Sequence, residues 1–541
     1  MASAARRWIG LVVISLAVAL IIVDSTIVNV AIPSIVDDLG ITSTQVQWVQ
    51  ESYTIVFAAL LLTFGTIADR VGRRRMMVIG ITIFSLASIA AALAPTGDLL
   101  ILSRVVQGVG GAMILPTSLS IINANFHGRE RGIAFAVWGS TIGGMAAVGP
   151  LLGGWLTTDF SWRWAFGINV PLGIITIVGA LLTVAESRAA HPMRLDPVGA
   201  VLSVITSASL VFALIEGRTY GWWETESPLM FGDWEWTFPI SPTPFLFAIA
   251  VLSAAAFVAW GLARQRRGRD PMLPFGLFRI PSFSNGNIAA LIVSLGEFGI
   301  ILSLPLWLQN VLGYDALQTG YVLLGLAIGA FAASGVAGTL GQRVAPVWTV
   351  RVGILLEIAG LVVIAFVIAV DTPWWQIVIG LFVYGFGVGL ATAQLTGVVL
   401  ADVPVAQGGQ ASGTQSTARQ FGSALGIAIL GTVLFTSLGT NLDEELEPFV
   451  PEPQRAQVVD AVVDSAGAAI PAIEAQSPEA AQAAREAFSD ATRASALTAA
   501  GFLAVGLLAT ISLGSGRRQD PSAPDDDIDT VPAASGGSSA V

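Results

Sequence analysis

Fourteen apolar runs follow one another along this chain of 541 residues, each about long enough to cross a membrane. A helix needs about 20 apolar residues, at 1.5 Å per residue, to span the hydrocarbon core of a bilayer. The composition agrees, because 12% of the residues are charged, whereas soluble domains carry about 25%. The sequence therefore predicts an all-α polytopic membrane protein, with spans at 9–31, 46–68, 76–95, 99–122, 133–157, 164–185, 197–215, 244–263, 284–309, 319–340, 347–369, 373–400, 413–437 and 495–513.

The basic residues support this count of spans. All 26 are Arg; nineteen fall in loops that the spans place on one side, five fall on the other, and Arg104 and Arg419 lie within spans. Arg-rich loops face the cytoplasm. We therefore expect an even number of spans in a bacterial plasma membrane, with both termini inside. The run after Arg6 and Arg7 exceeds 20 residues and lacks a small-residue cleavage site, which indicates a first span and not a signal peptide.

The chain contains an internal repeat, as transporter folds often do. An offset of 273 residues superimposes four pairs of features: 65–71 on 338–344, Gly149 on Gly422, Gly153 on Gly426, and Asp24 on Glu297. We predict two six-span pseudo-symmetric halves, with spans 7 and 8 inserted between them. The expected division is an N-terminal half (1–195), the inserted spans (196–270), a C-terminal half (271–515) and a disordered cytoplasmic tail (516–541).

Two connections are unusual. The segment 216–244 carries four Trp and five acids, which predicts a short hairpin at the outer membrane interface. The segment 439–494 is acidic and rich in Ala, and we expect it to be an external loop with one or two amphipathic helices over 458–493.

Asp24 is the first candidate site residue, because it lies deep within the first span. A charge there costs at least about 2.5–3.5 kcal/mol, so it normally faces a water-filled cavity or a partner. Arg104 in the fourth span stays charged and needs an acceptor, and Asp24 is the predicted one. The alternative is a purely structural role, in which Asp24 only forms a hydrogen bond to a neighbouring helix. Glu297, the repeat-related acid, invites the same two interpretations.

Further acids extend this set. Glu51 and Glu357 also lie in predicted spans, although an ion pair of Glu357 with Arg351 is as good an explanation as a transport role. Neither His127 nor His191 falls in a span, so a proton relay within the membrane would have to use carboxylates.

The run 143–154 is rich in Gly, with Gly149, Pro150, Gly153 and Gly154 at its end. Small residues at a spacing of four permit close helix contact, and Pro150 removes one backbone donor and bends the span. A generic packing face is the alternative interpretation.

The loop 65–75 follows the second span and holds one acid and four Arg within seven residues. It fixes the cytoplasmic side, and a topological anchor is its simplest function. The residues of interest within it are Gly65, Asp69, Arg70, Gly72 and Arg73.

Taken together, these runs resemble the fourteen-span drug/proton antiporter family of the major facilitator superfamily. The resemblance covers residues 8–437 and rests on 24–33, 65–75, 104–112, 149–154, 161–171 and 419–426. It implies proton-driven export, a cytoplasmic gate held by Asp69 and Arg73, and an antiporter motif at Gly149-Pro150. The long segment 439–494 and the acid at Glu51 depart from the family pattern.

The function expected from these observations is multidrug efflux: a proton-coupled antiporter that exports hydrophobic or cationic small molecules by alternating access. A lipid or metabolite exporter of the same fold is the alternative. A membrane-embedded enzyme is a weaker one, because we find no Asp-rich metal motif and no nucleotide-binding loop. With no Cys, Cys-ligated metals and disulfides are excluded. The expected partners are a hydrophobic small molecule, protons and the bilayer, with no nucleic acid, metal or cofactor, and the chain is expected to act as a monomer.

Overall fold

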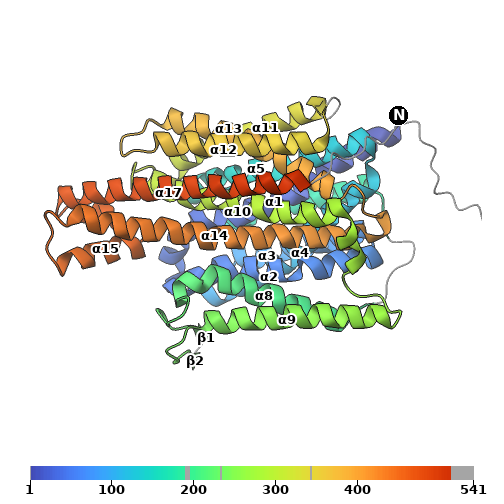
Figure 1. The fold of residues 1–541 in the computed structure, drawn as a ribbon, viewed down its shortest axis with the longest axis horizontal. Coiled ribbons are helices and arrows are strands. Elements are labelled where there is room, and N and C mark those ends of the chain that lie inside the picture. The colour runs from blue at the N-terminus through green and yellow to red at the C-terminus, as the bar shows by residue number, and fades with distance from the viewer. Residues whose placement is uncertain (1, 189–194, 232–233, 341–343, 513–541) are drawn as a thin grey trace, which may run out of the picture.

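The computed structural model describes residues 2–188, 195–231, 234–340 and 344–512. The predicted disordered tail 516–541 lies outside these residues. Nearly parallel helices form an elongated bundle, with the N-terminus at one end of its long axis (Figure 1). The first half contains α1 (Ala2–Leu39), α2 (Ser43–Val71), α3 (Arg73–Ala92), α4 (Gly97–Asn125), α5 (Gly128–Asp159), α6 (Arg163–Gly167) and α7 (Asn169–Thr183).

The inserted segment and the second half complete the bundle. The inserted helices are α8 (Pro197–Tyr220) and α9 (Pro242–Arg266), with β1 (Met230–Phe231) and β2 (Trp234–Glu235) between them. The second half contains η1 (Phe275–Arg279), α10 (Pro281–Asn310), α11 (Ala316–Leu340), α12 (Pro346–Val367), α13 (Trp374–Val399), η2 (Val405–Gln407), α14 (Gly408–Leu446), α15 (Gln454–Asp464), α16 (Ile470–Glu474), α17 (Pro478–Ala509) and η3 (Thr510–Ser512).

Every predicted span falls on helical structure, but the count of fourteen is not reproduced by length and apolarity alone. Among the described residues, twelve helical segments are long and apolar enough to cross a membrane, or thirteen when the bent α5 is taken as one span. In α11 the apolar stretch is the shorter Leu317–Ala333. The short α6 and the longer α7 together form one span, Arg163–Thr183.

The packing repeats between the two halves. In the first half α1 packs along α5, and α4 packs between α2 and α3. In the second half α10 packs along α14, and α13 packs between α11 and α12. The halves meet along two seams, α5 against α11 and α2 against α14. The inserted α8 packs on α9, α2 and α14, so this pair lies beside the second seam, along one edge of the bundle (Figure 1).

Repeat-related glycines explain how these pairs approach so closely. A Cβ at Gly149 would lie 1.8 Å from Thr26 Oγ1, and one at Gly153 would lie 3.0 Å from a backbone oxygen of α1. In α14, a Cβ at Gly422 would lie 2.1 Å from Leu291 O. The Gly spacing therefore places one helix against the backbone of its neighbour in both halves.

Helices α14 and α17 continue beyond the apolar stretches, which corrects the expected loop at 439–494. The helix α14 runs on to Leu446, and α17 begins at Pro478, so α15 and α16 bridge two long helices. Leu446 and Phe488 are buried in the core that runs through the bundle. Ala favours helix, and the Ala-rich residues 480–494 extend α17. The extended α14 and α17 project together from the end of the bundle remote from the N-terminus (Figure 1). The Trp-rich segment forms the expected hairpin, with Met230 paired to Glu235.

Candidate functional site

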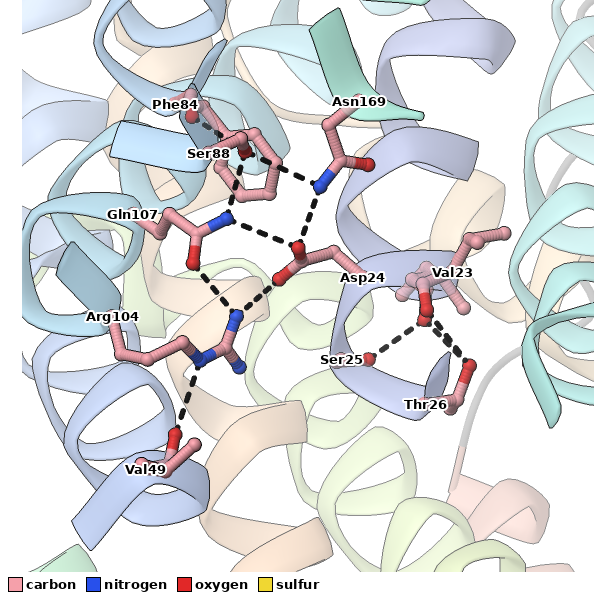
Figure 2. A network of polar contacts seen from close by, with 11 residues as sticks. Val23, Asp24, Ser25, Thr26, Val49, Phe84, Ser88, Arg104, Gln107 and Asn169 are labelled. Atoms are coloured by element: carbon pink, nitrogen blue, oxygen red, sulfur yellow. Dashed lines mark hydrogen bonds and ion pairs between the residues drawn. The ribbon is translucent and has the colours of Figure 1, made fainter. Parts of the chain in front are cut away.

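Asp24 lies in the middle of a polar network inside the first half (Figure 2). Its side chain is fully buried and accepts three hydrogen bonds. Arg104 Nη1 donates to Oδ2 at 2.5 Å, Asn169 Nδ2 to Oδ1 at 2.7 Å, and Gln107 Nε2 to Oδ1 at 3.1 Å. The predicted pairing of Asp24 with Arg104 is confirmed, and it joins α1 to α4 and to the start of α7.

Arg104 is held from several directions. Its Nε donates to Val49 O at 3.1 Å and its Nη1 also donates to Gln107 Oε1 at 2.9 Å. Its guanidinium lies 4.3 Å from the centre of the Tyr53 ring. A buried guanidinium needs such acceptors, because an unpaired buried charge is strongly destabilising. The charge on Arg104 is thus tied to α2 as well as to Asp24.

Ser88 orients the two amides around the acid. Its Oγ donates to Phe84 O at 2.8 Å and accepts from Gln107 at 2.8 Å and from Asn169 at 3.2 Å. Both amide nitrogens therefore point at Asp24. These partners were not predicted. Gln107 and Asn169 lie in the family motifs, but Asn169 is 145 positions from Asp24, and no spacing rule connects the two.

The second half holds the repeat-related acid in a different setting. Glu297 Oε1 accepts from Thr392 Oγ1 at 2.7 Å, and Oε2 lies 3.3 Å from Arg419 Nη2. The position that corresponds to Arg104 under the 273-residue offset is Ile377, so the cation comes from α14 and not from α13. The acids are thus repeated, but their ion pairs are not.

Glu357 stands apart from Arg351. The Arg351 Nη2 donates to Thr510 O at 3.0 Å, and its guanidinium lies over Trp348, so the alternative of a Glu357–Arg351 pair is wrong. Glu357 is fully buried, and among the described residues neither of its carboxyl oxygens has a hydrogen-bond partner. Its charged neighbours are Glu297 and Arg419. Glu51, the other additional acid, contacts Glu216 at the end of α8.

The segment 65–75 was expected to be a loop but is helical except at Gly72, because α2 runs on to Val71 and α3 begins at Arg73. It brings Asp69 against the second half. Arg73 donates to Asp69 Oδ1 from Nε at 3.0 Å and from Nη2 at 2.7 Å. Gly409 N lies 2.9 and 2.8 Å from the two carboxylate oxygens, and Gln410 N lies 3.2 Å from Oδ2. These amides open α14, where the positive end of the helix dipole favours an anion.

Other residues of the loop shape the same seam. A Cβ at Gly65 would lie 2.5 Å from Gly409 O, so only a glycine lets α2 and α14 meet here. Gly72 turns the chain at φ +115°, between α2 and α3. Glu186 accepts from the first amides of α3, at 3.1 Å from Arg74 N, and ties the loop to the chain after α7. Arg70 is exposed.

The run around Pro150 lies against the Asp24 helix. The helix α5 bends by 40° between Ala146 and Val148. Residue 146 is where a proline at 150 leaves a carbonyl without its amide donor. Gly153 and Gly154 are buried in the following turn.

Comparison with known proteins identifies the family. The chain matches the Major Facilitator Superfamily over residues 14–427. It is 36% identical over 433 residues to the puromycin resistance protein pur8 of Streptomyces alboniger, covering 79% of this chain and 82% of that protein. It is 32% identical over 511 residues to the multidrug resistance protein Stp of Mycobacterium tuberculosis, covering 93% and 91%.

A solved structure supports the fold independently. The human organic anion transporter MFSD10 aligns with 93% of this chain and 99% of its own, at a TM-score of 0.57 and 12% sequence identity. At that identity the likeness concerns the fold alone. With its repeated helix packing and its match over residues 14–427, this multi-pass membrane protein belongs to the Major Facilitator Superfamily.

Proposed function

We propose that this chain is a proton-coupled antiporter that exports hydrophobic or cationic small molecules by alternating access. The observation that carries the proposal is the buried carboxyl of Asp24, bound by Arg104 and two amides inside a membrane span. Relatives named for puromycin resistance and multidrug resistance support the substrate class. A transporter, and not an enzyme, is the function that this family membership favours.

The proton step follows from the Asp24 network. Ionised Asp24 neutralises Arg104, whereas a protonated Asp24 cannot, because Arg keeps its charge at any working pH. Binding of a proton therefore loosens the link between α1 and α4 and frees the guanidinium. On α1, Val23 and Thr26 flank Asp24 and contact α5 at Gly149, so a small rearrangement of α1 would be transmitted to the bent helix.

The gate step follows from Asp69. Its bonds to Arg73 and to the start of α14 close one end of the α2–α14 seam. We propose that this end is cytoplasmic, that the described state faces outward, and that these bonds break when the protein opens inward. In the second half, Glu297 and Glu357 would favour cationic substrates.

We propose a bacterial plasma membrane protein with both termini inside, working as a monomer without a cofactor. The division into a first half (1–195), an inserted pair (196–270) and a second half (271–515) would then describe the units that move.

The decisive experiment measures proton release from purified protein in liposomes when puromycin or the aromatic cation ethidium is added. We expect the wild type to release protons and to pump either probe uphill. Asp24→Asn should lose both activities yet still exchange the probe downhill. Asp38→Asn is the matched control, because Asp38 lies on the same helix but is half exposed and pairs with Arg163. Uphill pumping by Asp24→Asn would refute the assigned role.

A further inference from the structure

Two carboxyl groups meet where the inserted helix α8 packs on α2. Glu51 lies in the third turn of α2. Glu216 lies in the last turns of α8, and its carboxyl group neighbours that of Glu51. Glu216 is 1% exposed. Glu216 was expected at the start of an external loop, but α8 continues to Tyr220 and buries it.

The other contacts of this pair leave one carboxyl oxygen on each acid without a hydrogen-bond donor among the described residues. Gln47 Nε2 donates to Glu216 Oε2 and to Thr219 Oγ1, the latter at 3.1 Å. Glu51 Oε2 and Glu216 Oε1 are buried, and neither has a conventional donor among the described residues. Ionised carboxylates can only accept hydrogen bonds, so one proton between these neighbouring acids would supply the donor that both buried oxygens lack.

The charged groups around the pair do not offer another solution. Tyr220, one turn after Glu216, has a buried hydroxyl without a partner in the described structure. Arg218 points away, with its guanidinium 3.3 Å from the centre of the Phe435 ring. The facing surface of α14 is apolar. No ion pair reaches either acid within the described residues.

We propose that Glu51 and Glu216 share a single proton and form a second proton-binding site, distinct from Asp24. Like charges in contact inside a membrane cannot both ionise without a large cost. With the proton in place, the pair holds α8 on α2. Without it, the two carboxylates repel and α8 is pushed from α2.

The position of this site on α2 suggests what it does. Val49 and Tyr53, two residues of α2 that contact Arg104, flank Glu51 at a distance of two positions. Because residues two apart face opposite sides of a helix, α2 carries the Asp24 network on one face and the shared proton on the other. The same helix carries Asp69 of the gate in its last turn. The inserted helices thereby become part of the coupling, an inference that rests on the proposed proton-driven export.

The test is infrared difference spectroscopy of the purified protein in lipid, which reads the C=O stretch of unionised carboxyls. At neutral pH we expect the wild type to show a band that disappears in Glu51→Gln and also in Glu216→Gln, because each variant removes one half of the pair. Glu224→Gln, an exposed acid of the hairpin segment, is the control and should keep the band. Gln retains a hydrogen bond, and elution as a single species by size exclusion checks folding of each variant.

The outcomes separate this inference from the proposed function. Loss of the band in both single variants supports the shared proton, whereas a band unchanged in both overturns it. Two bands, each removed by only one variant, also overturn it, since the acids would then hold separate protons. Puromycin-driven proton release by the wild type is measured in parallel. If the release is intact and the band is unchanged, only the second site fails. If the wild type shows no release, the proposed coupling fails, whatever the band does.

Discussion

At the scale of single residues, the centre of the first half is a buried ion pair, Asp24 and Arg104, in which each side chain has several hydrogen-bond partners. Asp24 takes three donors and Arg104 takes three acceptors, so neither can be removed alone without leaving the other buried and unpaired. Breaking a buried pair in this way typically costs about 3–5 kcal/mol, whereas removing both charges can be neutral. Stability and transport can therefore be separated experimentally at this site.

We predict that Arg104→Leu lowers the thermal stability of the purified protein by about 3–5 kcal/mol, because Asp24 is left as a lone buried acid. Adding Asp24→Asn in the double variant should restore most of the stability without restoring uphill transport. Thermal unfolding in detergent is the measurement. Equal destabilisation by the single and the double variant would mean that the ion pair is not the source of the effect.

A second residue-scale prediction concerns the close contact of α5 with α1. Gly149→Ala should lower the free energy of unfolding by about 1–3 kcal/mol, the usual cost of overpacking, because its Cβ would collide with Thr26. Expression or transport should fall as a result. Gly132→Ala on the same helix meets nothing within 4 Å and should be silent. Expression level and puromycin resistance of cells carrying each variant report the difference. Equal expression and equal resistance in the Gly149→Ala and Gly132→Ala variants would show that the close contact at Gly149 is not required.

At the scale of elements, the end of α2 and the start of α14 form a lock between the halves. Asp69 is the only side chain that connects Arg73 with the Gly409 and Gln410 amides among the contacts described. Each hydrogen bond to a charged group contributes about 1.5–3 kcal/mol. Losing one or two of them shifts a two-state equilibrium by tenfold or more, so this lock can set which side of the transporter is open.

We therefore predict that Asp69→Asn and Arg73→Ala reduce transport several-fold while insertion and expression stay near normal. In this Cys-free chain, Ser412→Cys places a thiol at a buried position of the seam. Its alkylation rate should rise about tenfold or more when Asp69→Asn is added, because the seam then opens more often. Arg75→Ala, whose side chain is 66% exposed, is the control. Unchanged transport in both gate variants would reduce the loop to a topological anchor.

The positions of the helices could be predicted from the sequence, whereas several contacts between them could not. The apolar runs located every spanning helix, and the 273-residue offset anticipated the repeated packing of α1 on α5 and of α10 on α14. Burial of Asp24 and Arg104 in apolar spans was enough to predict their pairing, because each charge needs a partner. Asn169 could not be assigned to Asp24, nor Arg419 to Glu297, since such contacts depend on how helices rotate and cross, which no spacing within one helix encodes.

At the scale of the whole molecule, sidedness is the first property to establish. We predict that the α15 end is external and that the end with the N-terminus is cytoplasmic, following the Arg-rich loops. Asp464→Cys in α15 and Gln265→Cys near the end of α9 are both exposed positions at opposite ends. An impermeant thiol reagent should label the first and spare the second in intact cells. The reverse pattern would invert the proposed topology.

The orientation of the protein in the membrane determines the direction in which the membrane potential drives a coupled charge. Each elementary charge that moves inward across the membrane gains about 2.3 kcal/mol per 100 mV. That corresponds to roughly a fiftyfold substrate gradient per charge, since about 1.36 kcal/mol is a factor of ten. In the proposed mechanism, a proton makes and breaks the ion pair of Asp24 in the first half. Glu297 has Thr392 and Arg419 as partners and the buried Glu357 beside it, so the other half holds two acids and one Arg in a different arrangement.

This asymmetry predicts different losses from the two acids. Glu297→Gln keeps an acceptor for Thr392 but removes the negative charge, so transport of the cation ethidium should fall about tenfold while a neutral hydrophobic probe, N-phenylnaphthylamine, is pumped nearly as before. Asp24→Asn should instead abolish uphill pumping of both probes, because the proton site serves every substrate. Inverted membrane vesicles with an imposed pH gradient measure both rates, and the exposed Asp315→Asn is the control. If Asp24→Asn still pumps and Glu297→Gln does not, the two acids have the opposite roles, and the proton enters through the second half.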